Sequence, residues 1–457
     1  MGEKGQKCEN IRELALDALL LIEQQEQYSH VVISGMLKKY DYLEGRDKAF
    51  FKRLVSGTLE RQIELDYVID SFSSTPTGKM RPLIRVLLRM SAYQILFMEG
   101  AADSAAVNEA VKLAQRRKFV SLKGFVNGVL RSIVRNKDKI HYPDAKKDKD
   151  NYLSVRYSMP RWLIEKWNRE LGAEKTEAVL EGLLQERPVT IRLRSGLPKE
   201  EKEKVLKELK ASGIAVRESG ILPYAFYLSG TEGLLHLPAF RAGKFTVQDA
   251  SSMLAVEAAG IQSEDFVMDT CAAPGGKMLF AAEKAFKGSV LARDVSEAKL
   301  LLMQENKERM HAEQVTLQVF DATKEDPAYY EKADVVLADV PCSGLGVIGR
   351  KPDIKYRAAA EGLLELQKLQ KQILEAVWRY VKPGGVLLYS TCTISRGENE
   401  EMAEWFLKEH PFHAESLDGF LPEKFSDDGT AKGQLQFLPG IHGTDGFFIA
   451  RFIRNQE

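Results

Sequence analysis

The chain contains 457 residues, which predicts about three domains at roughly 150 residues each. Hydrophobic residues make up 44% and charged residues 28%, so the composition argues against a disordered chain, and no apolar run is long enough to span a membrane. The 65 basic and 65 acidic residues cancel, which gives no overall charge to attract a polyanion. Four cysteines are no disulfide framework at this length, so a reducing, cytoplasmic setting is expected.

The amino-terminal part of the chain, residues 10 to about 135, is predicted to be all-helical. Apolar residues recur there at spacings of three and four, as at Val86, Met90 and Tyr93. Gly100 interrupts this pattern before it restarts.

A basic segment lies near the end of this helical part, because residues 112–139 contain nine basic residues and one acid. From Cys392 to the end, by contrast, six basic residues face twelve acids. The basic segment fits a surface that binds a phosphate backbone, although a solvated helix face is the more frequent explanation of a charge run. Its basic residues are Lys112, Arg116, Arg117, Lys118, Lys123, Arg131, Arg135, Lys137 and Lys139.

The middle of the chain changes character twice. Residues 136–160 are highly charged and are predicted to be a linker with a short strand or docking segment. Pro160 then opens a helix, and after Pro188 the pattern becomes that of a small α+β unit. We expect a strand at 190–194, a helix at 199–212 and strands at 214–217 and 224–229.

From Gln248 onward, apolar strands alternate with helices. The predicted strands are 265–269, 289–294, 315–320, 334–339, 386–390 and 447–452. The predicted helices are 277–286, 296–311, 360–381 and 398–408. This alternation predicts a mostly parallel, Rossmann-like sheet with helices on both faces, in which ligands bind at the carboxyl ends of the strands.

The first loop at this predicted edge has the sequence DTCAAPGGK, from Asp269 to Lys277. It follows a strand and opens a helix, where backbone N–H groups can meet a nucleotide-like ligand, and its two glycines allow close approach. It matches neither the dinucleotide fingerprint nor the P-loop, and a plain tight turn is the alternative. The residues expected to line the ligand are Cys271, Ala272, Ala273, Pro274, Gly275, Gly276 and Lys277.

Acidic residues end four of the predicted strands: Asp269, Asp294, Asp321 and Asp339. Asp294 is placed to accept both ribose hydroxyls of a nucleoside, and Asp321 to hold an adenine amino group. Each acid alone would be an ordinary turn or helix cap, but four on one edge indicate a binding site.

Two of the four cysteines also follow apolar strands, Cys342 in DVPCSG and Cys392 in STCT. Both thiols are therefore expected at the ligand-binding edge. A metal pair is disfavoured because further ligands are absent nearby, so no metal is expected. The remaining alternatives are chemistry at the thiols and two small buried side chains.

Together these motifs resemble the RNA cytosine-C5 methyltransferases of the NSUN/RsmB family. The resemblance covers about 188 to 453, including FTVQDAS at 245–251 and GTDGFF at 443–448. The helical part resembles, more diffusely, the NusB RNA-binding domain through VNEAVKLA at 107–114 and FVNGVLR at 125–131. The combination is typical of the bacterial members that modify cytosine 967 of 16S ribosomal RNA.

The resemblance implies that the loop Cys271–Lys277 and the strand-end acids bind S-adenosyl-L-methionine. It also implies that Cys392 is the nucleophile and Cys342 its partner. Addition of a thiolate to C6 of cytosine makes C5 nucleophilic, and Cys342 then assists release of the adduct as a base or through a water molecule. Asp339 is expected to hydrogen-bond the base, with Lys277 in support. The sequence departs from the family's Arg-x-Asn pattern at Arg194, which leaves a local RNA contact or a packing detail in doubt.

The expected organisation is a NusB-like domain at 1–140, a linker at 141–160, a small α+β RNA-binding or connecting unit at 161–240 and a catalytic domain at 241–457. We expect a monomer that acts on free or early-assembly 16S ribosomal RNA, without a membrane. The alternatives are the same chemistry on transfer RNA or large-subunit ribosomal RNA, a NusB-like antitermination factor with a vestigial catalytic domain, and a methyltransferase of small molecules. The intact cysteine pair argues against the antitermination factor, and the helical basic module against the small-molecule enzyme.

Overall fold

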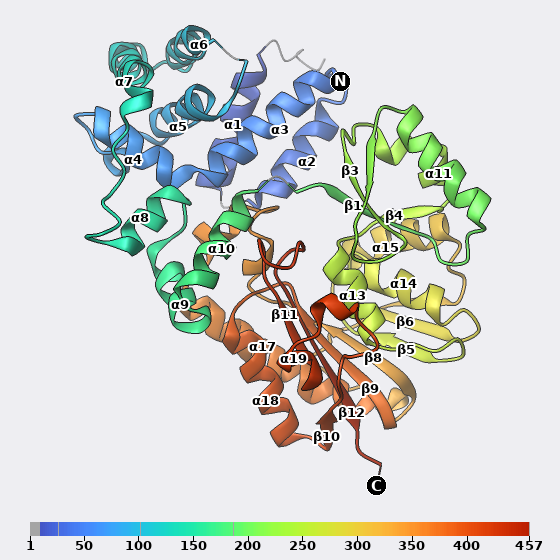
Figure 1. Ribbon diagram of the computed structural model, residues 1–457. Coiled ribbons are helices and arrows are strands. Elements are labelled where there is room, and N and C mark those ends of the chain that lie inside the picture. The colour runs from blue at the N-terminus through green and yellow to red at the C-terminus, as the bar shows by residue number, and fades with distance from the viewer. Residues whose placement is uncertain (1–9, 26, 101, 186, 457) are drawn as a thin grey trace. The chain divides into compact units, whose positions relative to one another are not determined.

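The computed structural model describes residues 10–25, 27–100, 102–185 and 187–456, and its chain divides into two compact units (Figure 1). The helical unit comprises Met1–Leu184 and Ile348–Arg357. The mixed unit comprises Gln185–Val347 and Ala358–Glu457. Cys8 lies outside the described residues, and the other three cysteines are free thiols.

The described part of the helical unit contains no strand, as the sequence predicts for residues 10–135. Its helices are α1 (Ile11–Gln24), α2 (Ser29–Lys39), α3 (Gly45–Glu60), α4 (Gln62–Phe72), α5 (Pro82–Phe97), α6 (Asp103–Arg116), α7 (Lys123–Asn136), α8 (Lys149–Arg156), α9 (Arg161–Leu171), α10 (Ala173–Leu184) and α16 (Ile354–Arg357). Helix α5 supplies the centre of the core, because most of its side chains are buried among those of α1, α3 and α7.

The strand expected within 136–160 is wrong, and the expected docking segment is correct. Helix α8 occupies this region because the Asp148 side chain accepts a hydrogen bond from the Asn151 N–H and so caps the helix. Before α8, Tyr142 stacks on Tyr67 and donates a hydrogen bond of 2.6 Å to Glu64. The segment is therefore anchored on α4.

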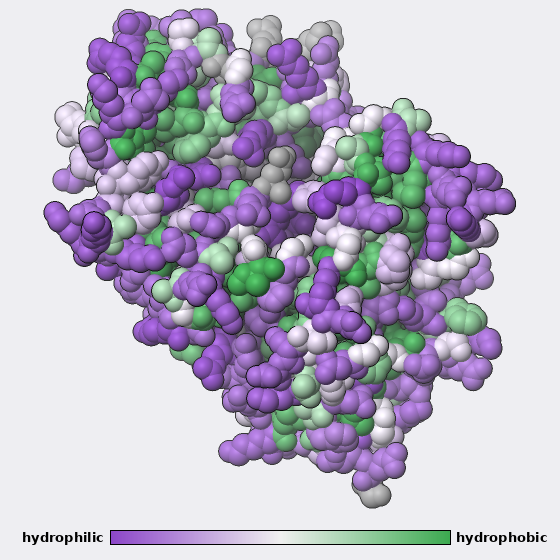
Figure 2. All heavy atoms as spheres, viewed as in Figure 1, coloured by the Kyte–Doolittle hydropathy of each residue, from purple (hydrophilic) through white to green (hydrophobic). Residues whose placement is uncertain are grey.

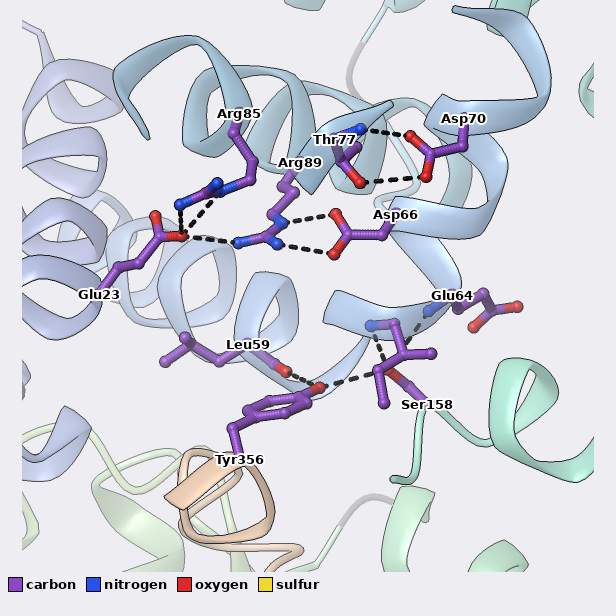
Figure 3. Close-up of polar contacts among 11 residues, drawn as sticks. Glu23, Leu59, Glu64, Asp66, Asp70, Thr77, Arg85, Arg89, Ser158 and Tyr356 are labelled. Atoms are coloured by element: carbon purple, nitrogen blue, oxygen red, sulfur yellow. Dashed lines mark hydrogen bonds and ion pairs between the residues drawn. The ribbon is translucent and has the colours of Figure 1, made fainter. Parts of the chain in front are cut away.

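Buried charges of the helical unit are paired in a network that Figure 3 shows. Arg89 donates two hydrogen bonds of 2.6 Å to Asp66 and one of 3.2 Å to Glu23. In the same view, the Tyr356 hydroxyl donates to the Leu59 carbonyl at 2.8 Å and lies 3.3 Å from the Ser158 hydroxyl. Hence Ile348–Arg357, which includes Tyr356, is held by hydrogen bonds as an integral part of this unit.

The small sheet of the mixed unit is entirely antiparallel, with the strand order β2-β3-β1-β4. Its strands are β1 (Val189–Leu193), β2 (Ala215–Glu218), β3 (Ala225–Ser229) and β4 (Phe245–Val247), and its helices are α11 (Lys199–Ala211) and α12 (Pro238–Arg241). The predicted strands and helix are confirmed, whereas the three-residue β4 is not anticipated by the sequence pattern. Strand β1 carries the fully buried Arg192, whose guanidinium donates a hydrogen bond of 2.5 Å to Glu283.

The large sheet has eight strands in the order β10-β12-β9-β8-β5-β6-β7, with β11 also paired to β12 (Figure 1). Strands β5 to β9 are parallel, and β12 runs antiparallel to β9. The strands are β5 (Phe266–Asp269), β6 (Ser289–Asp294), β7 (Val315–Val319), β8 (Ala333–Asp339), β9 (Val381–Thr391), β10 (Phe412–Ala414), β11 (Gln434–Phe437) and β12 (Phe447–Arg454). The helices are α13 (Ala250–Ala258), α14 (Gly276–Lys284), α15 (Glu297–Met310), α17 (Ala360–Val377), α18 (Glu400–Glu409) and α19 (Asp428–Ala431).

Helices cover both faces of this sheet because successive strand residues point to opposite sides. Val335 and Leu337 pack with α13 and α14, whereas Val336 and Ala338 pack with α17 and α18. The result is a Rossmann-like α/β fold, as the alternation of strands and helices predicts.

Hydrophilic side chains cover most of the face seen in Figure 2, with hydrophobic side chains in smaller groups between them. This agrees with helices that turn their apolar faces inward. A separate observation is that no helix among the described residues has the length and apolar character needed to cross a bilayer.

Candidate active site

The predicted site residues lie at the carboxyl ends of adjacent parallel strands. In the register of the sheet, Asp269 pairs with Ala292 and Leu337, and Asp339 pairs with Ser390. Asp294 ends β6, opposite Val319 near the end of β7. The loops that follow β5, β6, β8 and β9 therefore meet at one edge.

The loop between β5 and α14 approaches that edge with its backbone. Gly275 has φ +104°, a left-handed conformation that favours glycine, and helix α14 begins at the next residue. The preceding Ala273–Pro274 peptide bond is cis. Burial raises the pKa of the Cys271 thiol far above its usual range, so this cysteine packs as a neutral side chain.

Asp269 is a buried acid that makes no hydrogen bond of regular geometry through either carboxylate oxygen with any described residue. Burial raises its pKa to about 7, although the Lys277 cation opposes this shift. An unmatched carboxylate at this depth is costly unless a ligand supplies the missing donor. The site thus offers a position for a positively charged or hydrogen-bonding ligand group.

Asp294 and Asp321 lie beside this loop, after neighbouring strands. The Asp294 carboxylate accepts hydrogen bonds from the N–H groups of Ala273, at 3.3 Å, and Ser296, at 3.0 Å. Asp321 is partly exposed, and hydrogen bonds from the hydroxyl and N–H of Thr323 lower its pKa. Both acids therefore lie at the edge where the strand ends meet, and the hydrogen bond from Ala273 connects Asp294 to the loop Asp269–Lys277.

The two cysteines come together across the ends of β8 and β9. Their sulfur atoms are 3.3 Å apart, and the Cys392 N–H also donates a hydrogen bond of 3.3 Å to the Cys342 sulfur. The hydrogen bond to Cys392, followed by burial, raises the pKa of Cys342 well above its usual range. This arrangement keeps the proton on Cys342 and places its sulfur beside that of Cys392.

Lys277 links the loop after β5 to the cysteine pair. Its ammonium group lies 2.6 Å from Asp339, whose other oxygen accepts a hydrogen bond of 2.8 Å from the Ser390 hydroxyl. Burial lowers the pKa of Lys277, but the Asp339 carboxylate outweighs burial and the pKa is raised overall. Lys277 is therefore a cation at neutral pH, close enough to Cys392 for the two groups to interact electrostatically.

Comparison with known proteins gives matches over both units. The family model "16S rRNA methyltransferase RsmB/F" matches residues 257–453, the NusB family model residues 9–135, and an RsmF/B-like ferredoxin-like domain residues 159–232. The probable ribosomal RNA small subunit methyltransferase B of Bacillus subtilis is 37% identical, with 97% of this chain and 98% of that protein covered. Its counterpart in Synechocystis is 33% identical, over 96% and 98% of the two chains.

This chain belongs to the RsmB family. Among solved structures, the crystal structure of PH0851 superposes on it with a TM-score of 0.80 and 29% identity, covering 97% of this chain and 98% of the other. The RsmB family combines a NusB domain, a ferredoxin-like unit and a methyltransferase fold, and all three are present here.

The cofactor of the RsmB family is S-adenosylmethionine, and the residues present fit it. Asp269 offers a buried carboxylate without a hydrogen-bond partner, which suits a cationic ligand. Gly275 lets the backbone of the loop approach closely, and Asp294 lies at the strand end where ribose hydroxyls are commonly held. The carboxylate of Asp269, the backbone at Gly275 and the position of Asp294 are all features of the described residues.

Several residues of the site escape sequence reasoning. Ser390 is the hydrogen-bond donor to Asp339, and Glu398 is a fully buried acid that contacts Ser343, the residue after Cys342. The sequence places Glu398 at the start of a predicted helix, where it reads as an ordinary helix-start acid. Its nearness to the STCT motif is the only signal that could have indicated a role.

Proposed function

We propose that this member of the RsmB family transfers a methyl group to C5 of a cytosine in 16S ribosomal RNA, of the cytosine-967 type, through a covalent adduct with Cys392. The observation that carries the proposal is the pair of sulfur atoms 3.3 Å apart, beside the partly buried Lys277–Asp339 ion pair. A site that only bound RNA would need neither thiol at this edge.

The cysteine pair supplies covalent catalysis. Cys392 attacks C6 as a thiolate, since a thiolate is a strong nucleophile near neutral pH and a good leaving group. Electron density then moves to C5, and N3 of the ring takes a proton at the Lys277–Asp339 pair. Asp339 accepts a hydrogen bond from the amino edge of the base and so holds C6 in reach of Cys392.

The second half of the reaction releases the product. S-adenosylmethionine, when bound, would supply a methyl group on a positively charged sulfur for attack by C5. Because Cys342 keeps its own proton, a water molecule that Cys342 positions removes the C5 proton; the C6–S bond breaks, Cys392 leaves as a thiolate, and the N3 proton returns to Lys277–Asp339. Cytosine and the methyl donor thus give 5-methylcytosine, the demethylated donor and one proton, so atoms and charge balance.

The cofactor is held by residues of the loop Cys271–Lys277 with Asp294 and Asp321. Asp294 would accept the ribose hydroxyls, and Asp321, which lies after the neighbouring strand, would hold the adenine amino group. Asp269 offers its carboxylate to the cationic end of the ligand.

We infer that the NusB-like residues 1–140 help to bind RNA, followed by a linker at 141–160, a small RNA-binding or connecting unit at 161–240 and the catalytic domain at 241–457. The structure divides the basic segment into two groups. Lys112, Arg116, Arg117 and Lys137 form ion pairs with Glu109, Glu13, Asp17 or Asp103. The group that is exposed and pairs with no described carboxylate consists of Lys118, Lys123, Arg131, Arg135 and Lys139.

The second group is available for phosphate contacts. The target base itself must be unpaired or flipped out, because C6 cannot be reached by a thiol inside a duplex. Free or early-assembly RNA meets this requirement more readily than a finished particle.

The test is bisulfite sequencing of RNA incubated with the purified protein and S-adenosylmethionine. Unmodified small-subunit ribosomal RNA, large-subunit ribosomal RNA and transfer RNA are treated in parallel, with Cys392→Ala as the inactive control. One protected cytosine in the small-subunit RNA alone is the expected result. Protection only in another RNA overturns the substrate, and protection by Cys392→Ala overturns the mechanism.

A further inference from the structure

Glu398 is a fully buried acid close to the cysteine pair that the proposed reaction does not use. It ends a short 3-10 turn, Arg396–Glu398, six residues after Cys392. Removing a carboxylate from water is costly unless hydrogen bonds compensate it, so the partners of this group are informative.

The carboxylate of Glu398 accepts three hydrogen bonds. One oxygen accepts from the Ser343 hydroxyl at 2.6 Å, and the other accepts from the Ser343 N–H at 2.8 Å and the Gln370 amide at 3.1 Å. The same Gln370 amide donates to the Pro341 carbonyl at 3.0 Å. Glu398 and Gln370 thus hold the residues on both sides of Cys342.

The network also reaches the Cys392 side. The Ser343 hydroxyl is 2.7 Å from the hydroxyl of Thr393, the residue after Cys392. The Tyr389 hydroxyl, from strand β9, donates a hydrogen bond of 2.6 Å to the Glu398 carbonyl and fixes the turn. Ser343 therefore connects the two cysteine-bearing loops, and Glu398 orients Ser343.

We propose that Glu398, assisted by Gln370, is a positioning residue that holds Cys342 beside Cys392 so that the RNA adduct can be released after methyl transfer. This inference rests on the proposed covalent mechanism. It adds no chemical step, because Glu398 acts through its hydrogen bonds to Ser343 and, by way of Gln370, on Pro341.

The geometry predicts which half of the reaction depends on Glu398. Cys392 lies at the end of strand β9, and its backbone is set by the sheet, with Ser390 paired to Asp339. Cys342 lies in a loop three residues beyond β8, where Glu398 and Gln370 contact both neighbours. Loss of the carboxylate should therefore displace Cys342 and leave Cys392 in place.

The test compares Glu398→Gln with wild type and with Cys342→Ala. Glutamine removes the negative charge and one acceptor oxygen. In either orientation of the amide, its N–H₂ group faces at least one group that donates to Glu398 in the wild type, so the hold on Ser343 and Gln370 is weakened. Single-turnover methyl transfer and the covalent adduct on a denaturing gel are measured with the same small-subunit RNA. Thermal unfolding and cofactor affinity report folding.

The expected result is that first-turnover methyl transfer changes by less than about threefold, while adduct release slows by roughly 10- to 100-fold, so that adduct accumulates as in Cys342→Ala. Ser343→Ala, which removes only the hydroxyl link, should show the same effect more weakly. It also keeps the test valid if Glu398→Gln folds poorly.

Two outcomes overturn the inference. Normal turnover of a folded Glu398→Gln protein excludes a positioning role, and an equal loss of methyl transfer, release and cofactor binding indicates a purely structural one. Cys342→Ala separates this inference from the proposed function. If adduct accumulates in Cys342→Ala but not in the Glu398 and Ser343 variants, only the role of Glu398 is rejected. If adduct accumulates in none of the three variants, the covalent mechanism is rejected.

Discussion

Buried charge is treated differently in the two units. In the helical unit, Arg89 is matched by Asp66 and Glu23 through three hydrogen bonds. At the catalytic edge of the mixed unit, Asp269 has no regular hydrogen bond with a described residue, and the Cys342 sulfur lies 3.3 Å from a second sulfur. Charges that are fully paired stabilise the packing of helices, whereas buried groups that are incompletely paired are typical of sites that bind a ligand or carry out catalysis. The following predictions examine that difference.

Replacement of Cys392 by alanine should have the largest effect. We expect methyl transfer to fall by at least about 1,000-fold, because the covalent step is lost, while cofactor affinity stays within about twofold. Methylation assays and calorimetric titration with S-adenosylmethionine measure the two quantities. A variant that still methylates RNA at a tenth of the wild-type rate would show that the unmatched sulfur pair is not the reaction centre.

Replacement of Arg89 by methionine should break the matched network. It leaves Asp66 partly buried without its cation and Glu23 with Arg85 alone, so the free energy of unfolding should fall by about 3 kcal/mol. Hydrogen exchange in helices α1, α4 and α5 locates the loss. Arg81→Met, at an exposed position before α5, is the matched control and should change the stability by less than about 0.5 kcal/mol.

Replacement of Asp269 by asparagine should separate stability from binding. Because burial outweighs the attraction of Lys277 for this carboxylate, the variant should unfold no more easily than wild type, and cofactor affinity should fall roughly tenfold. Differential scanning fluorimetry and calorimetric titration measure the two effects. A clear loss of stability with unchanged affinity would place Asp269 among the matched structural charges instead.

The raised pKa of Asp269, about 7, also predicts a pH dependence. Folding favours the protonated acid, so the stability contribution present below the ordinary pKa is lost as pH rises through about 7. Binding of the cationic cofactor should show the opposite trend and strengthen from pH 6 to 8, with Lys277, Asp339 and Asp294 as the charged neighbours. The profile should become flatter in Asp269→Asn, and an unchanged profile would assign the titration to another group.

Neutralisation of the unpaired basic residues should have the smallest effect. The triple variant Lys118→Gln, Lys123→Gln, Arg131→Gln should bind RNA about fivefold more weakly, with the slope of log affinity against log salt reduced by about 2 to 3. The matched control neutralises Lys112, Arg116 and Lys137, whose charges are already paired. If the two triple variants lose RNA affinity equally, ion pairing does not determine which basic residues contact RNA.

Much of the fold follows from local sequence pattern. The predicted strands and helices of the mixed unit all overlap observed ones, and the all-helical interpretation of residues 10–135 is correct. The errors occur where local pattern is weak. The short strands β4, β10 and β11 are not predicted, and helix α8 replaces the expected strand. The helix predicted at 360–381 ends at Val377 as α17, and β9 begins at Val381, five residues before the predicted strand.

Candidate site residues could be placed at one edge because parallel strands bring their carboxyl ends together. What the sequence could not show is the state of each group. Arg117 pairs with Glu13 and Asp17, about 100 positions away, and this pairing removes it from the exposed basic surface. Such contacts depend on the packing of α1 against α6, which no local pattern reports.

By itself, the sequence determined the family, the order of elements and the edge at which the motifs meet, because these depend on periodicity and on residues adjacent in the chain. Only the tertiary structure decided the 3.3 Å approach of Cys342 and Cys392, the unmatched burial of Asp269 and the hold of Glu398 on Ser343. Cys342 and Cys392, like Ser343 and Glu398, lie about 50 positions apart in the sequence. The energies of these contacts and of the buried Asp269 depend on distance, burial and hydrogen-bond partners. The chemistry of the site is therefore a property of the fold more than of its motifs.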